Sequence, residues 1–206
     1  RRSTIYRIDY ANEGLNILPR GFLADARENV ASANNINYGY FMGGETPAGD
    51  VSTVSRLDYS NDSAVAATKG SMPGAVDNAG GIGNQNYGYL VGGSPDVYGG
   101  SQTERIDYSN DTPAASPKGD MTIKRMYAGG NSTADYGWIG GGAWSVPSPS
   151  YFSSVERMDF SNDTATFVLR GNLTTYQASK TTGGNNVFGY TIFGTNNYEL
   201  GQKTDY

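Results

Sequence analysis

The side chains best placed to do chemistry in this sequence are Arg and Asp residues that recur as Arg-x-Asp pairs. The pairs are Arg7 and Asp9, Arg56 and Asp58, Arg105 and Asp107, and Arg157 and Asp159. Because successive side chains of a strand point to opposite faces, residues two positions apart share one face. A carboxylate held beside a guanidinium could act in acid–base catalysis. An active site is normally unique in a domain, whereas packing devices recur with the architecture. We therefore expect structural pairing within or between repeats, with a functional role as the alternative.

The composition removes most other kinds of catalytic and metal site. The 206 residues include neither His nor Cys. Zinc, haem, blue-copper and iron–sulfur centres lose their usual ligands, and the Ser-His-Asp and Cys-His nucleophile arrangements are excluded. Any metal site would have to be built from oxygen ligands. We predict a protein that is not an enzyme and that carries no cofactor and no metal.

Turns rich in Asn and Asp are a place where oxygen ligands gather. One such turn holds Asp107, Asn110 and Asp111. A calcium site needs several convergent carboxylates and carbonyls, and this turn lacks a bidentate Glu at suitable spacing. Asx and hydroxyl side chains also bond their own backbone in tight turns. Turn formation is therefore the preferred interpretation, and calcium binding is the alternative.

These residues belong to an internal repeat. The Asp residues of the motif Arg-Ile-Asp-Tyr and its variants are separated by 49, 49, 52 and 46 residues. From each Asp to the next aromatic motif, such as Tyr87-Gly88-Tyr89, the distance is 29 residues in all four copies. All length variation falls between the aromatic motif and the next Asp. Since insertions are tolerated in exposed loops rather than in paired strands, one loop per repeat varies and is the expected working surface.

Each repeat has the pattern of short strands separated by turns. Alternation predicts a strand at 101–108, and further strands are predicted at 87–91 and 164–169. A small-residue strand such as 79–82 suits a place where sheets crowd around an axis. No stretch shows a sustained helical period of apolar residues. Four short strands in about 49 residues predict an all-β fold, a β-propeller of four-stranded antiparallel blades.

We expect one propeller domain over 1–206, divided as the repeat dictates. The units are a partial blade of outer strands at 1–20, blades at 21–69, 70–118 and 119–170, and a partial blade of inner strands at 171–206. The last motif breaks off, which predicts an excerpt of a larger propeller of roughly six to eight blades. One alternative is a closed four-bladed ring, in which the N-terminal outer strands complete the C-terminal blade. Another is a ring closed by two or more chains.

The strand motifs resemble kelch repeats over essentially the whole chain. The match rests on Tyr-Gly-Tyr-Leu-Val-Gly-Gly at 87–93 and Ser-Ser-Val-Glu-Arg-Met-Asp-Phe at 153–160. The usual outer-strand Trp is missing, with Phe167 nearest that position, and Phe193-Gly194 replaces Gly-Gly in the fourth copy. The compound motif also resembles tandem kelch-like repeats in virion structural and tail-fibre proteins of marine bacteriophages, particularly those that infect cyanobacteria.

This resemblance implies a kelch-like propeller located in the virion. It implies a non-enzymatic structural or interaction module, expected in a tail fibre or another surface appendage. The partners would be other virion proteins or a host surface receptor or glycan, and a homo-oligomer stays open. A carbohydrate-binding adhesin is the alternative function. The kelch-like oxidases of the galactose-oxidase type need Tyr-Cys and His copper ligands, which are absent here.

The variable loops supply the candidate binding residues. They carry acidic, amide and aromatic side chains, namely Glu45, Asp50, Asp96, Tyr98, Trp144, Tyr151, Asn197 and Tyr198. Flat apolar rings edged by hydrogen-bonding groups suit protein contacts and sugar stacking alike. For Trp144, packing against a neighbouring blade is the further alternative.

Charge and hydropathy narrow the choice of partners. The net charge is −5 and no Lys/Arg cluster occurs, which argues against a nucleic-acid surface or an anionic membrane. No apolar run approaches the roughly 18 residues of a membrane span. We therefore predict no nucleic-acid partner and no membrane span.

Overall fold

The computed structural model describes residues 1–12, 14, 17–94, 99–144, 150–176, 178–193 and 202–205, with the backbone alone at 179–181, 192, 193 and 202–205. Over these ranges the chain forms short antiparallel strands and two single-turn 3₁₀ helices, with no α-helix. The predicted all-β class is confirmed. In this part of the chain, no helix is long and apolar enough to cross a membrane.

Among the described residues, three four-stranded antiparallel sheets form the largest units. The first sheet contains β3 (Ala31–Asn34), β4 (Tyr38–Met42), β7 (Thr53–Asp58) and β8 (Ala67–Ser71). The second sheet contains β9 (Gly80–Gly83), β10 (Tyr87–Val91), β11 (Thr103–Asp107) and β12 (Ser116–Pro117). The third sheet contains β13 (Gly129–Ser132), β14 (Tyr136–Gly140), β17 (Ser154–Asp159) and β18 (Val168–Asn172). In each sheet the strands are neighbours in chain order.

Smaller sheets flank these three. The N-terminal hairpin is β1 (Arg2–Arg7) with β2 (Leu18–Arg27). The C-terminal sheet is β19 (Ser179–Gly184), β20 (Phe188–Phe193) and β21 (Gln202–Asp205). Two short hairpins are β5 (Glu45–Thr46) with β6 (Gly49–Asp50), and β15 (Ala143–Trp144) with β16 (Ser150–Tyr151). The 3₁₀ turns η1 (Tyr59–Asn61) and η2 (Phe160–Asn162) follow β7 and β17.

The register of the sheets repeats with the sequence motifs. The aromatic residue that opens a second strand lies opposite the motif Asp of the third strand: Tyr38 and Asp58, Tyr87 and Asp107, Tyr136 and Asp159, Phe188 and Asp205. The predicted strand 87–91 coincides with β10, and the strand predicted at 101–108 is the shorter β11. The strand predicted at 164–169 is present as β18, but it begins later, at Val168, and runs on to Asn172. Just before β18, the Phe167 amide instead donates at 3.0 Å to the carbonyl of Asp120, in the segment that follows β12.

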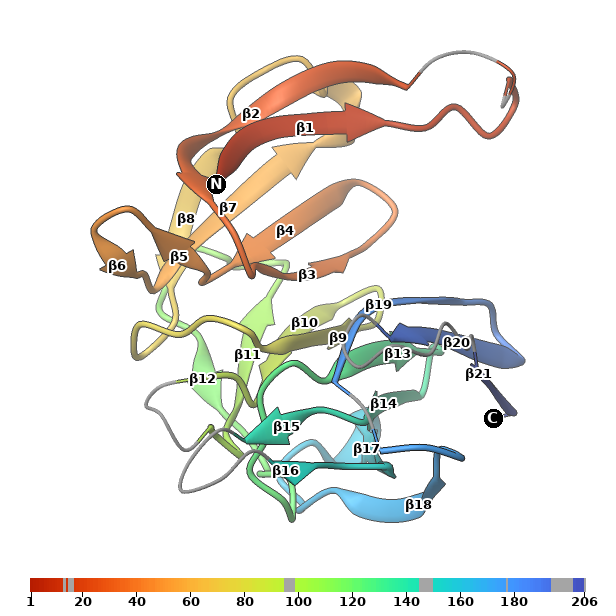
Figure 1. Ribbon diagram of the computed structural model, residues 1–206. Coiled ribbons are helices and arrows are strands. Elements are labelled where there is room, and N and C mark those ends of the chain that lie inside the picture. The colour runs from red at the N-terminus through yellow and green to blue at the C-terminus, as the bar shows by residue number, and fades with distance from the viewer. Residues whose placement is uncertain are drawn as a thin grey trace.

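The sheets stand side by side in an arc, with their first strands adjacent (Figure 1). Strand β9 lies against β3 and β13, and β13 also lies against β19. These strands are rich in small residues because their backbones nearly touch. A Cβ on Gly81 would lie 2.0 Å from the Ser32 carbonyl oxygen, and one on Gly130 would lie 2.3 Å from that of Gly81. The predicted crowding of the glycine-rich strands is confirmed.

Apolar side chains from adjacent sheets form the core between them. Tyr40 of the first sheet stacks on Tyr108 of the second, with 4.5 Å between ring centroids. Tyr89 of the second sheet stacks on Phe160 of the third at 5.2 Å. All four side chains are buried. Burial of one such side chain contributes about 1.5–3 kcal/mol, so these stacks hold neighbouring sheets together.

In two of the repeats, a buried arginine binds polar groups of a four-stranded sheet. Arg125, in the segment that precedes β13, is fully buried and pairs with Glu156 of β17, which is also fully buried. The Glu156 carboxylate accepts a second bond from the backbone amide of Thr122 at 2.7 Å. Arg27, the last residue of β2, holds the same place in the repeat and donates to the hydroxyl of Ser55 in the first sheet at 2.6 Å.

The second sheet keeps the carboxyl but lacks both donors. Glu104 stands in the place of Glu156 and is 9% exposed, while Val76 and Pro73 replace the arginine and the threonine. Proline has no N–H to donate. Within the described residues Glu104 Oε2 has no hydrogen-bond partner. Burial without a counter-charge raises the pKa of Glu104 to about 7.

We expect Glu104→Gln to stabilise the protein above pH 7 and Glu156→Gln to destabilise it. Because the folded pKa of Glu104 is raised, its favourable contribution is complete below the ordinary value of 4.5 and is lost as the pH rises through about 7. The loss amounts to about 3 kcal/mol, which Gln does not suffer. Glu156→Gln leaves Arg125 buried without its counter-charge, at a cost of about 3–5 kcal/mol.

Urea denaturation between about pH 4 and about pH 9 measures both effects. The two variants make the same change at the same place in adjacent sheets, so each is the control of the other. A Glu104→Gln protein that is no more stable than wild type at high pH would contradict the assignment.

Candidate functional site

Each motif Arg with a carboxylate partner contacts the turn of the following repeat. Arg56 Nη1 lies 2.7 Å from Oδ2 of Asp111, and the same oxygen accepts from the Tyr40 hydroxyl at 2.9 Å. Lys69 Nζ lies 3.3 Å from the other oxygen. Asp111 is 6% exposed. This carboxylate belongs to the second repeat, but three side chains of the first repeat satisfy it.

The arrangement recurs at two further junctions. The Asp163 carboxylate accepts from Arg105 at 2.7 Å and from the Tyr89 hydroxyl at 2.9 Å. Near the N-terminus, Arg7 Nη1 lies 2.8 Å from Asp62 Oδ2. The ion pairs of the motif Arg residues therefore run between repeats.

Three motif Arg residues also lie over the aromatic ring that opens the second strand. The Cζ-to-centroid distances are 4.3 Å for Arg56 and Tyr38, 4.2 Å for Arg105 and Tyr87, and 4.0 Å for Arg157 and Tyr136. A cation over a ring face is attracted by the ring quadrupole, which fixes the guanidinium at the edge of its sheet.

The motif Asp residues hold the turns instead. Asp58, Asp107 and Asp159 each accept the backbone amide of the Ser two positions later, at 2.8–2.9 Å, and also its hydroxyl. Asp9 accepts the Ala11 amide at 3.0 Å. The hydrogen bonds from Ser lower the pKa of the first three carboxyl groups. Among the described residues no hydrogen bond joins the Arg and the Asp of one motif.

The variable loops begin at the double glycine after the second strand. Gly92 and Gly93 have φ of +67° and +93°, where glycine alone is unstrained. A Cβ on Gly93 would lie 2.6 Å from the Asp77 carbonyl oxygen. The Gly93 amide donates to the Arg125 carbonyl of the next repeat at 3.0 Å. The loop therefore starts from a point fixed against the following sheet.

In the first and third sheets the variable loop forms the short hairpin β5–β6 or β15–β16. A bridge between Glu28 and Glu45, and one between Met126 and Ala143, ties each hairpin to the segment that precedes its sheet. Both hairpins follow the second strand, so they lie at the opposite end of the sheets from the turn that precedes that strand. We call the edge that carries the two hairpins the hairpin rim.

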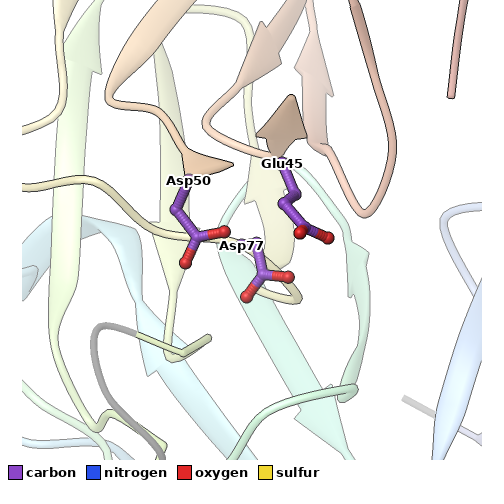
Figure 2. A group of neighbouring side chains, drawn as sticks. All are labelled: Glu45, Asp50 and Asp77. Carbon is purple, nitrogen blue, oxygen red and sulfur yellow. The ribbon is translucent and has the colours of Figure 1, made fainter. Parts of the chain in front are cut away.

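Three carboxylates converge at β5–β6, the hairpin of the first sheet (Figure 2). Glu45 of β5, Asp50 of β6 and Asp77, which precedes β9, place one oxygen each within 4.8 Å of one another. Asp77 is 7% exposed, and its Oδ2 accepts from the side-chain amides of Asn29 at 3.3 Å and Asn78 at 2.5 Å. The fold thus brings the predicted loop residues Glu45 and Asp50 together.

This carboxylate cluster is electrostatically strained. Burial, followed by repulsion from the neighbouring carboxylates, raises the pKa of Asp50 and of Asp77. Arg1 relieves part of the strain, since its guanidinium lies 2.5 Å from Glu45 and 3.5 Å from Glu28. Convergent carboxylate oxygens could hold a hard divalent cation.

The hairpin of the third sheet, β15–β16, carries aromatic rings instead. Trp144 meets Phe152 edge to face, with 5.7 Å between centroids, and the Arg125 guanidinium lies 5.3 Å from the Phe152 centroid. Trp144 and the predicted binding residue Tyr151 are both partly exposed. The hairpin rim therefore presents carboxylates at the first sheet and aromatic rings at the third.

Four predicted loop residues, Asp96, Tyr98, Asn197 and Tyr198, lie outside the described residues. Asp77 is the member of the rim that sequence reasoning missed. It joins Asp50 from the next repeat and belongs to no motif, so no spacing rule could have indicated it.

The first strands line an open cavity of about 660 Å³. Its lining is backbone and short side chains, including Ser32, Asn34, Asn131, Ser132 and Thr182, and it contains no charged residue among those described. Such a lining offers hydrogen bonds without a titratable group. It suits solvent or a neutral polar ligand better than acid–base chemistry.

Comparison with protein-family models and with curated proteins finds no match to this chain. A functional assignment therefore rests on the repeat motifs and on the geometry of the hairpin rim.

We expect Asp50→Asn to raise the melting temperature at neutral pH. The folded pKa of Asp50 is raised, so this carboxyl favours folding below its ordinary value of 3.8, and that contribution is lost as the pH rises through the folded pKa. The amide avoids the loss and removes repulsion from Glu45 and Asp77. Asp25→Asn, an exposed site on β2, is the matched control. A gain that persists undiminished in acid, where the carboxyl is protonated, would refute this cause.

We expect Asp111→Ala to destabilise the chain by about 3–5 kcal/mol, since Arg56 and Lys69 lose their partly buried counter-charge. Asp107→Ala in the same turn should cost only about 1 kcal/mol, because it removes a partly exposed turn cap. Urea denaturation of both variants measures the difference. Equal losses would show that the junction carboxylate does no more than shape its turn.

Proposed function

We propose that this chain is part of a kelch-like β-propeller that acts as a non-enzymatic interaction module. The repeated four-stranded meander, with adjacent first strands around one cavity, supports the propeller assignment. The hydrogen bond from the Gly93 amide to the Arg125 carbonyl of the next repeat also supports an arrangement of successive blades.

The observation that carries the interaction role is the contrast between a constant frame and a variable rim. At two junctions the frame repeats the same distances, 2.7 Å from Arg to the turn carboxylate and 2.9 Å from Tyr. The hairpin rim changes from the Glu45 cluster to the Trp144 pair over the same frame. A scaffold that holds its frame and varies its loops is suited to multivalent contact, in which weak contacts combine into avidity.

The virion is the proposed location, with a tail fibre or another surface appendage as the component. The basis is the resemblance of the compound motif to phage virion repeats. The proposed partners are other virion proteins or a host surface receptor. Antibodies against the purified chain should then label intact marine cyanophage particles in electron microscopy. If particles of a phage whose genome encodes this sequence stay unlabelled even after mild disruption, the proposed location is contradicted.

A carbohydrate-binding adhesin is the second candidate. The Trp144 and Phe152 pair favours it, because an exposed aromatic face beside polar groups can stack on a sugar ring.

We expect Trp144→Ala to weaken partner binding about tenfold or more, since aromatic anchors dominate interfaces. Biolayer interferometry against purified virion proteins and a glycan array measure the two candidate functions separately. Ile36→Ala is the matched control: Ile36 is 78% exposed in the turn before β4, at the opposite end of that strand from the hairpin rim. Glycan binding that depends on Trp144 would favour the adhesin, and equal effects of the two variants would argue against the rim.

A further inference from the structure

Arg125 contacts both ends of the variable loop that joins β10 to β11, which we call the second loop. Its backbone carbonyl accepts from the Gly93 amide at 3.0 Å, and its backbone amide donates to the Gly100 carbonyl at 2.9 Å. Gly93 lies just after β10, and Gly100 lies shortly before β11. The backbone of one residue in the next repeat therefore holds the two ends of this loop together.

The side chain of Arg125 does the same for the loop that joins β14 to β17, which we call the third loop. Its Nη1 donates to the Gly141 carbonyl at 2.8 Å and to the Ser154 carbonyl at 3.0 Å. Gly141 follows β14 directly, and Ser154 is the first residue of β17. Nη2 donates to the Ser154 hydroxyl at 2.9 Å and pairs with Glu156. A guanidinium can make these bonds together because its N–H groups form one rigid, planar fork.

The same guanidinium also supports the aromatic part of the third loop. It lies 5.3 Å from the Phe152 centroid, and the Phe152 ring meets Trp144 edge to face at 5.7 Å. Arg125 and Glu156 are fully buried, whereas Trp144 and Phe152 are partly exposed. A buried ion pair is thus connected to the aromatic surface of the hairpin rim through a single ring.

The other repeats make these contacts one at a time. The Arg27 side chain holds the ends of the loop in the first sheet, at 2.8 Å from the Gly43 carbonyl and 3.0 Å from that of Thr53. Val76 takes the place of Arg125 between the first and second sheets. Its backbone also bonds to the loop of the first sheet, but its aliphatic side chain cannot bind the second loop. Arg125 combines both kinds of contact.

We propose that Arg125 is a positioning residue that couples the second loop to the third loop, so that the two loops act as one binding surface with Trp144 on its exposed side. The use of this surface for binding rests on the interaction module proposed above. The coupling itself rests only on the contacts of Arg125. Because one residue holds the ends of both loops, a partner that fixes the third loop would also fix the base of the second, and the reverse.

Arg125→Lys tests the positioning role, because lysine keeps the charge beside Glu156 but lacks the fork that holds two carbonyl groups. In a Trp138→Phe background, Trp144 is the sole tryptophan. We expect acrylamide to quench its fluorescence about twofold more efficiently in Arg125→Lys, since the third loop is released from its base. Arg27→Lys makes the same change beneath the loop of the first sheet and is the matched control, which should leave the quenching unchanged.

Amide hydrogen exchange followed by NMR tests the coupling. The Phe152 amide is hydrogen-bonded within the third loop, the Gly93 amide to Arg125, and the Val51 amide within the loop of the first sheet. In Arg125→Lys, the Phe152 and Gly93 amides should both exchange about tenfold faster or more, and the Val51 amide should not change. Arg27→Lys should give the opposite pattern.

A wild-type measurement covers the case in which circular dichroism shows that Arg125→Lys does not fold. At rising urea concentration, the Gly93 and Phe152 amides should open with one common free energy and urea dependence, distinct from those of Val51. Separate openings of Gly93 and Phe152 overturn the coupling, as does a folded Arg125→Lys in which only Phe152 exchanges faster.

The positioning role is overturned if Arg125→Lys leaves Trp144 quenching unchanged, or if Arg27→Lys raises it equally. Partner binding that depends on Trp144 should weaken about tenfold in Arg125→Lys, and unchanged binding would overturn the role as well. Quenching and exchange need no partner. A rim that binds nothing would therefore contradict the proposed function, and this outcome is distinguishable from a failure of the coupling.

Discussion

The arc depends on carboxylates that belong to one repeat and are satisfied by the repeat before it. Asp111 is buried, and its charge is tolerable only because Arg56, Lys69 and Tyr40 all reach it from the first sheet. A buried charge with an incomplete set of partners is costly. These three contacts therefore tie adjacent sheets together. The stability of each sheet becomes partly the property of its neighbour, as in other repeat architectures.

The sequence could predict the strands and their order, because alternation and spacing are local signals. Strand β10 coincides with its predicted range, whereas the predicted outer strand at 164–169 failed at its start. The Phe167 amide donates a hydrogen bond to the carbonyl of Asp120 in the preceding repeat, a contact that no local sequence pattern encodes. The different roles of the Arg and the Asp in the Arg-x-Asp motif could not be predicted from the sequence either. Both side chains share a face, but the partner of each depends on whether the turn of the same repeat or of the next repeat is nearer.

The second sheet shows how far the frame can change and still hold. With Val76 in place of an arginine, the Gly92 carbonyl accepts instead from the Gln102 side chain at 2.9 Å. Arg27, at the end of β2, makes the corresponding bond to the Gly43 carbonyl, which follows β4 of the first sheet. The backbone acceptor thus has a substitute donor, whereas Glu104 Oε2 has no hydrogen-bond partner among the described residues. A buried neutral acid costs less than a buried anion, so Glu104 can remain in the core when it is protonated.

The contact of Gly81 with the Ser32 carbonyl has a consequence for the width of the cavity. Where two backbones meet without side chains between them, peptide dimensions set their separation. Exchanging side chains cannot bring the first strands closer, and any larger residue would force them apart. The spacing of the first strands, and with it the width of the open cavity that they line, is therefore set by backbone contact and does not vary gradually with the side chains that line it.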